Sequence, residues 1–208
     1  MGGLDSSGAG FRGCGDVRGS LAKPAALAVV TGLQDFVAPL LLATRERYLP
    51  KSSCTVATLS QVRMPHAITG ERMHRCCRLD AEAVAQFASL CGDQNPIHSD
   101  AEHASRTRFG GIVVSGPHLS SLLMGMTASY FSKPGPNGPR AMLGLDFRFR
   151  FRRAVLAGQP IELSWEVVAV REKASLAGDL VFLAGRVRDV GGQDAVTAVG
   201  KVLVCERL

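Results

Sequence analysis

Apolar residues follow a helical pattern directly after Leu79. They recur at i, i+3, i+4 and i+7, which places them on one face of a helix: Val84, Phe87, Ala88 and Cys91. Asp80 is a suitable N-cap residue, and Leu79 with Val84 has the spacing of a hydrophobic staple. The pattern therefore predicts a helix that begins after Asp80 and ends near Gly92.

A second apolar stripe begins close to Pro117, whose fixed φ suits the first turn of a helix. Its members repeat at helical spacing among small residues: Leu119, Leu122, Leu123, Met126 and Tyr130. Because this stretch carries few charges, we expect a buried helix. The segment KPGPNGP at 133–139 contains three prolines and two glycines, so it is predicted to be a loop.

The remaining sequence alternates with the period of two that is typical of half-buried strands. In 141–153 the odd positions from Leu143 to Phe151 are apolar and most even positions are charged, and 161–170 alternates similarly. The segments 180–190 and 195–205 flank a Gly-Gly turn and resemble a hairpin. With a first strand at 72–78, the chain is predicted to be an α+β protein, in which a long buried helix lies between the first two of five mainly antiparallel strands.

The N-terminal segment reads differently from the rest. It opens with MGGLDSSGAGFRGCG, which is rich in Gly and Ser and has too little apolar surface to order itself. The apolar stretch 25–42 is interrupted by Gly32 and Pro39. We therefore expect a poorly structured extension over 1–70, with a targeting segment as the alternative, followed by one domain over 71–208.

Composition excludes several classes of protein. The 208 residues are 46% hydrophobic with a net charge of +6, and no run approaches the roughly 18 apolar residues of a membrane-spanning helix. The six cysteines form no CxxC pair, so we expect reduced thiols. Reduced thiols favour the cytoplasm, with a mitochondrion or another organelle as the alternative.

The segment FASLCGDQNPIH at 87–98 carries the most chemistry. Gly92 ends the helix and Pro96 prevents its continuation, so a rigid turn presents Asp93 and His98. A carboxylate and an imidazole at this spacing can act as a general acid and base on one water. The same residues are also compatible with an ordinary turn of no catalytic role.

The segment resembles the MaoC-like, or type 2, enoyl-thioester hydratases and dehydratases. The resemblance continues through SDAEHASRTRFGGIVVSGPHLSSLL and returns in LDFRFRFRRAVLAGQPIEL, and it covers about residues 71–208. It implies a hot-dog fold, in which a sheet wraps around a long central helix. It also implies reversible hydration of trans-2-enoyl thioesters to (R)-3-hydroxyacyl thioesters, on coenzyme A or an acyl carrier protein, without a metal or another cofactor.

The resemblance also assigns roles to residues. Asp93 would deprotonate the attacking water, His98 would supply the proton to the α-carbon, and the backbone N–H of Gly116 would stabilise the enolate oxygen. Asn95 would support the turn or the acyl group. The sequence departs from familiar members at Ser115 and Met124, although Ser115 to His118 fits a Ser-Gly-x-His variant, which makes Ser115 and His118 candidates for substrate contact.

Other features leave alternatives open. Arg148, Arg150, Arg152 and Arg153 either bind the phosphates of the carrier or form a solvated strand face, and nucleic acid is a weaker third reading. His98, Asp100 and His103 could be imagined as metal ligands, but no Cys or His pair with the spacing of a zinc site supports them.

A single domain leaves sheet edges free, and this predicts a homodimer. An acyl-thioesterase and a non-catalytic thioester-binding subunit remain the alternative functions.

Overall fold

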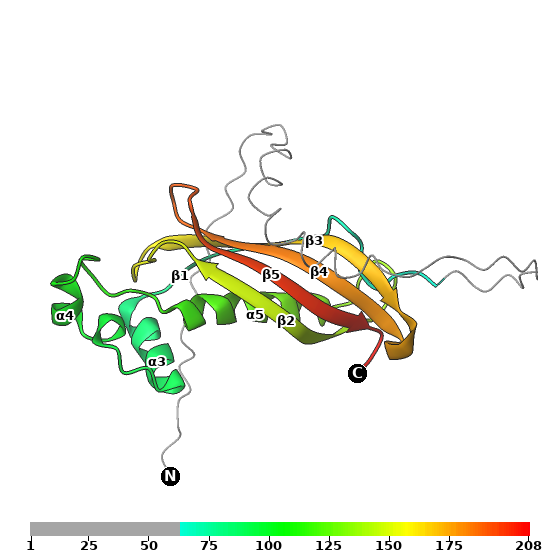
Figure 1. The fold of residues 1–208 in the computed structure, drawn as a ribbon, viewed down its shortest axis with the longest axis horizontal. Coiled ribbons are helices and arrows are strands. Elements are labelled where there is room, and N and C mark those ends of the chain that lie inside the picture. Colours follow the sequence, from blue (N-terminus) through cyan, green and yellow to red (C-terminus); the bar gives the residue numbers. More distant parts are fainter. Residues whose placement is uncertain (1–62) are drawn as a thin grey trace, which may run out of the picture.

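The computed structural model describes residues 63–208, and a strongly curved antiparallel sheet forms one layer of it (Figure 1). The strands lie in the order β1-β3-β4-β5-β2. Their bounds are β1 (Arg72–Arg78), β2 (Ala141–Phe151), β3 (Pro160–Lys173), β4 (Gly178–Arg188) and β5 (Asp194–Cys205). The long helix α5 (Gly116–Phe131) lies along one face of this sheet.

The shorter helices cluster between β1 and α5, at one end of the molecule (Figure 1). They are α3 (Ala81–Cys91), η1 (Pro96–His98) and α4 (Ala101–Ser105), and a further short helix, η2 (Ala174–Leu176), joins β3 to β4. This arrangement confirms the predicted α+β class, the five antiparallel strands and the central helix inserted between the first two strands.

Helix α3 begins and ends as its sequence predicts. The Asp80 carboxylate accepts a hydrogen bond from the Ala83 N–H at 2.8 Å, and Gly92 ends the helix with a left-handed φ of 71°. Val84 is buried together with Leu79, as expected for a hydrophobic staple. Cys91 is the exception, because it was expected on the apolar face but is exposed at the last turn.

The core lies between α5 and the centre of the sheet. The helix buries Leu119, Leu123 and Met126, and the indole of Trp165 on β3 donates to the Leu123 carbonyl at 2.9 Å. Trp165 packs directly over Gly185 of β4, where an added Cβ would lie 2.5 Å from the indole. This position therefore requires glycine for the central tryptophan to fit.

Strand β2 follows the predicted alternation only in its middle. Phe147 and Phe149 are half-buried, whereas Leu143, Leu145 and Phe151 are 49%, 43% and 55% exposed. The pairing of β2 with β5 shifts between Gly144 and Asp146, and such a bulge turns the preceding residues to the opposite face. The expectation that every odd position faces the core is therefore wrong. Because β2 is the last strand of the sheet, these apolar side chains lie on a free edge.

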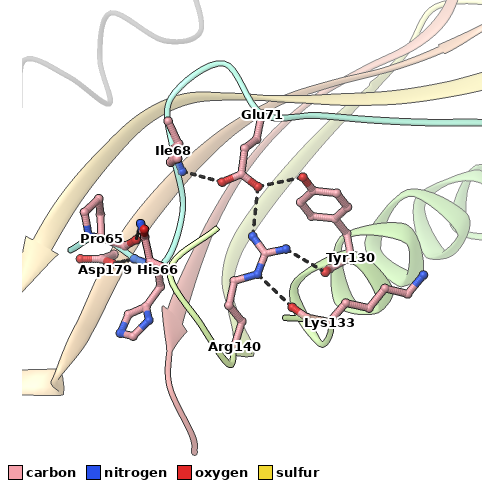
Figure 2. Close-up of polar contacts among 9 residues, drawn as sticks. Pro65, His66, Ile68, Glu71, Tyr130, Lys133, Arg140 and Asp179 are labelled. Carbon is pink, nitrogen blue, oxygen red and sulfur yellow. Dashed lines mark hydrogen bonds and ion pairs between the residues drawn. The ribbon is translucent and has the colours of Figure 1, made fainter. Parts of the chain in front are cut away.

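A buried ion pair joins Glu71, just before β1, to Arg140, just before β2, beside the C-terminal end of α5 (Figure 2). Arg140 donates to the Glu71 carboxylate at 3.0 Å and to the carbonyls of Lys133 and Tyr130 at the C-terminal end of the helix. The Tyr130 hydroxyl donates to the same carboxylate at 2.8 Å. Burial, followed by this carboxylate, raises the pKa of Tyr130.

Part of the expected N-terminal extension lies against the sheet. Asp179, which is buried, pairs with Arg63 at 2.8 Å and accepts from the His66 N–H, and the Gly70 N–H donates to Val167. Residues 1–62, including the possible targeting segment, lie outside the described residues. Over 63–208, no helix has the length and apolar character needed to cross a membrane.

Candidate active site

Asp93 and its neighbours form a tight turn between α3 and η1. The Asp93 carboxylate accepts the Asn95 N–H at 3.1 Å, and the Asn95 side chain accepts the Ile97 N–H at 3.3 Å. Pro96 occupies the first turn of η1. These short-range bonds hold the turn rigidly and leave one carboxylate oxygen of Asp93 available, on a side chain that is one-third exposed.

His98 lies beside that carboxylate and is almost completely buried. Its Nδ1 is 2.6 Å from the Val113 carbonyl, which can only accept a hydrogen bond, so Nδ1 carries a proton. Nε2 lies 3.6 Å from Asp93 Oδ2. That separation is too long for a direct hydrogen bond but lets both atoms contact one water. The structure therefore brings together the two residues that the turn motif singled out.

Main-chain hydrogen bonds place the segment that supports His98. The Val113 N–H donates to Ile97 at 3.0 Å, the Val114 N–H donates to Val155 at 2.8 Å, and the Ala157 N–H donates to Ile112 at 2.8 Å. These bonds join the approach to α5 both to η1 and to the connection between β2 and β3. They carry the Val113 carbonyl toward His98 and position the start of α5 beside the same turn.

Residues Ser115 to His118 form the N-cap and first turn of α5. Ser115 is the N-cap and its hydroxyl accepts the His118 N–H at 3.3 Å. The N–H of Gly116 has no hydrogen-bond partner within residues 63–208, and Pro117 has no N–H to offer. An added Cβ at Gly116 would lie 2.9 Å from the Phe151 ring, so this ring covers the glycine closely.

His118, a candidate for substrate contact, is buried against α3. Its ring stacks on Phe87 with 4.1 Å between ring centroids and 7° between ring planes. Burial lowers the pKa of His118, so the imidazole is neutral at pH 7. The stack links α3, which leads to Asp93, with the first turn of α5.

The arginines of the possible phosphate site lie on or directly after β2, the strand whose last residue, Phe151, covers Gly116. Arg148 and Arg150 are exposed on β2, and Arg148 is 3.9 Å from Asp146. Asp100, one of the three residues considered for metal ligation, caps α4 by accepting the His103 N–H at 2.9 Å. Among residues 63–208, no group of three or more His, Cys, Asp or Glu side chains is arranged to hold a metal ion.

Sequence reasoning did not foresee three contacts: the Val113 carbonyl on His98, the Phe87 ring on His118 and the Phe151 ring on Gly116. A main-chain acceptor has no residue signature, and the ring contacts join segments from different elements. Only the aromatic character of 87 and 151 was visible in the sequence.

A family model described as "MaoC like domain" matches residues 60–179, which is more than half of the chain. The chain belongs to the MaoC-like domain family. This match contains the Asp93 turn, the whole of α5 and the sheet through β3. The resemblance noted in the sequence is therefore confirmed at the level of the family.

Some of the proteins that this chain resembles are named as enzymes, and others are named only as UPF0336 proteins. An (R)-specific enoyl-CoA hydratase from Aeromonas caviae is 32% identical over 128 residues, which span 62% of this chain and 88% of that protein. A 3-hydroxybutyryl-CoA dehydratase from Methylorubrum extorquens is 30% identical over 51% of this chain and 69% of the relative. A UPF0336 protein from Streptomyces avermitilis is 27% identical over 59% of this chain and 81% of its own length.

Solved structures agree with the hot-dog architecture of this MaoC-like domain. The (R)-hydratase from A. caviae involved in PHA biosynthesis superposes with a TM-score of 0.57 and 29% identity, over 69% of this chain and 98% of that chain. The HadBC 3R-hydroxyacyl-ACP dehydratase complex from Mycobacterium tuberculosis gives a TM-score of 0.56 at 17% identity, over 67% and 99% of the two chains. At 17% identity, the similarity to HadBC shows a shared fold and no more.

Proposed function

We propose that this protein reversibly hydrates trans-2-enoyl thioesters to (R)-3-hydroxyacyl thioesters. The observation that carries the proposal is the Asp93–His98 pair, whose Oδ2 and Nε2 lie 3.6 Å apart, with His98 almost completely buried and Asp93 one-third exposed. The hydratase from A. caviae and the dehydratase from M. extorquens support the same reaction class.

In the proposed reaction one water bridges Asp93 and His98. As its oxygen bonds to the β-carbon of the enoyl group, Asp93 as the principal base takes one proton from it and passes this proton to Nε2 of His98, which is bare because Nδ1–H donates to the Val113 carbonyl. The electron pair of the double bond moves through the α-carbon to the thioester oxygen. His98 then returns one proton to the α-carbon, so that H and OH are added overall.

The negative charge on the thioester oxygen needs a preorganised donor. The Gly116 N–H is suited to this role because it is unpaired within the described residues and stands at the positive end of a 16-residue helix. Asn95 and Ser115 support the site indirectly, since Asn95 holds the turn and the Ser115 hydroxyl caps α5.

The experiment follows loss of the conjugated enoyl absorbance of trans-2-enoyl-CoA substrates from short to long chain, and resolves the handedness of the product. We expect the (R)-product from the natural protein, and losses of at least about 100-fold in kcat for Asp93→Asn and for His98→Ala. Unchanged melting temperatures would show that both variants fold. Normal turnover in either variant would contradict the mechanism.

The same assay separates the alternative functions. Release of free thiol from acyl-CoA without loss of the enoyl group would identify a thioesterase. Saturable binding of acyl-CoA with neither reaction would identify a thioester-binding subunit. Parallel assays on enoyl groups carried by an acyl carrier protein would establish the carrier.

We further propose that Arg148 and Arg150 contact the phosphates of the carrier, since both are exposed cations on β2. Arg148→Gln should raise KM for enoyl-CoA while leaving KM for the corresponding enoyl-pantetheine, which lacks the nucleotide, unchanged. An equal KM for enoyl-CoA in the variant and the natural protein would refute this contact.

We propose that the protein is a homodimer that pairs through β2. Within residues 63–208 this 11-residue strand pairs with β5 alone, and it exposes Leu143 and Leu145 on the free edge of the sheet. A long apolar edge strand is a template for pairing with another strand. Light scattering should give twice the 22.0 kDa chain mass. A monomer at micromolar concentration would refute the proposal.

A further inference from the structure

His118 combines tight burial with an unused polar atom. The residue is 7% exposed, and its Nδ1 is the one fully buried side-chain nitrogen or oxygen among residues 63–208 that lacks a hydrogen-bond partner. Every other such atom in the described domain is satisfied. A buried polar atom without a partner costs free energy, so each instance in a folded protein calls for an explanation.

Packing alone does not explain a histidine at this position. The parallel stack on Phe87 could be made by a phenyl ring, which has the same planar shape and carries no buried nitrogen. A phenylalanine would therefore retain the contact between α3 and α5 and avoid the cost of the unpaired Nδ1. The imidazole must provide something that a phenyl ring lacks.

The state of the ring follows from its surroundings. Burial lowers the pKa of His118, so the ring is neutral and has one N–H and one bare nitrogen. Orphaned buried acceptors are tolerated better than orphaned N–H groups. The enclosed Nδ1 is therefore the bare nitrogen, and Nε2, which is neither enclosed in this way nor bonded within residues 63–208, carries the proton.

The place of the ring in the fold is next to the site. His118 stands in the first turn of α5, two residues after Gly116, and side chains on a helix lean toward its N-terminus. The Phe87 stack holds the ring between α5 and the helix that leads to Asp93. Neutral imidazoles at helix N-termini serve as electrophiles in enzymes that form enolates.

We propose that the Nε2–H of His118 is a second hydrogen-bond donor to the thioester oxygen, beside the backbone N–H of Gly116. The proposal rests on the proposed hydration reaction. In that reaction the donor strengthens its hydrogen bond as negative charge develops on the oxygen, and the proton stays on Nε2 throughout. His118 is then a catalytic residue that acts on the transition state more than on bound substrate.

Two substitutions separate the donor from the stacking ring. His118→Phe keeps the stack and removes both nitrogens, whereas His118→Gln loses the stack and keeps an amide N–H donor. His103→Gln is the matched control, because His103 is an exposed histidine on α4. Each protein is assayed with trans-2-enoyl-CoA for kcat and KM, and its melting temperature is measured.

We expect His118→Phe to lower kcat by about 100-fold with KM within about threefold of the natural value, as for the loss of one oxyanion donor. Its melting temperature should equal or exceed that of the natural protein. His118→Gln should retain about ten times the kcat of His118→Phe despite a lower melting temperature, and His103→Gln should behave as the natural protein.

A His118→Phe variant with kcat within about threefold of the natural value would overturn the proposal while leaving the hydration reaction intact. Equal kcat losses in both His118 variants would also overturn it, because the ring shape or the fold would then be responsible. Absence of turnover in the natural protein on every enoyl thioester would refute the proposed function, and this role of His118 with it.

Discussion

Adding one methyl group at Gly116 brings it against the ring of Phe151. The built Cβ lies 2.9, 3.0 and 3.2 Å from Cζ, Cε1 and Cε2, so the closest approach is about 0.5 Å short of the 3.4 Å at which ordinary contact begins. Gly116 is a helical residue without a left-handed φ, so alanine is compatible with its backbone. The contact with the ring is therefore the main cost of Gly116→Ala.

The size of the effect follows from the position of this residue. If the start of α5 moves by about 0.5 Å to relieve the contact, the Gly116 N–H moves with it. A misplacement of about 1 Å in a catalytic group costs about 100-fold, so half that displacement corresponds to about tenfold in kcat/KM. Phe151→Leu removes the three ring atoms involved and should restore most of the loss.

The test is a double-mutant cycle of the natural protein, Gly116→Ala, Phe151→Leu and the double variant. The kcat/KM for enoyl-CoA hydration and the melting temperature are measured for all four. We expect Gly116→Ala to lose about tenfold and the double variant to return to within about threefold of Phe151→Leu. Full activity in Gly116→Ala, or a loss that Phe151→Leu does not relieve, would refute the reasoning.

Three further predictions concern stability, measured as the free energy of unfolding in urea. Arg140→Met should lower it by about 3–5 kcal/mol because Glu71 is left buried without its cation, whereas Arg72→Met, which breaks an exposed pair, should cost at most about 1 kcal/mol; equal losses would contradict this. Ala177→Gly should raise it by up to about 1 kcal/mol, since Ala177 has a φ of 46°, and a decrease would argue against strain there. Because burial lowers the pKa of His118, the unfolded chain binds a proton more readily than the folded one below about pH 6.5, so stability should fall as pH decreases from there. That fall should be smaller in His118→Phe, and identical pH profiles would contradict it.

Local signals in the sequence predicted the parts of the fold that local physics decides. Asp80 and Gly92 bound α3 because a side-chain cap and a left-handed glycine act within a few residues. Asp93 and His98 meet because one short turn presents both. The bulge after Gly144 reverses the exposure of the first residues of β2, and it depends on pairing with β5, which no local pattern in 141–153 encodes.

The contacts that complete the site join distant segments. Phe151 meets Gly116 only after β2 is placed in the sheet, and Phe87 meets His118 only when α3 packs on α5. Alternation predicted an apolar residue at 151 but not which residue it would cover. The family resemblance supplied the role expected of Gly116, and the structure supplied the rings that restrict what can replace it.

The orientation of His98 depends on a main-chain carbonyl, that of Val113. No substitution at position 113 removes a carbonyl, so the side chain there can vary over generations while the imidazole keeps its tautomer. The neighbouring hydrogen bonds of Val155 and Ala157 are also made by backbone atoms alone. Mutational tolerance of this kind allows the sequence around a site to diverge widely while its geometry persists.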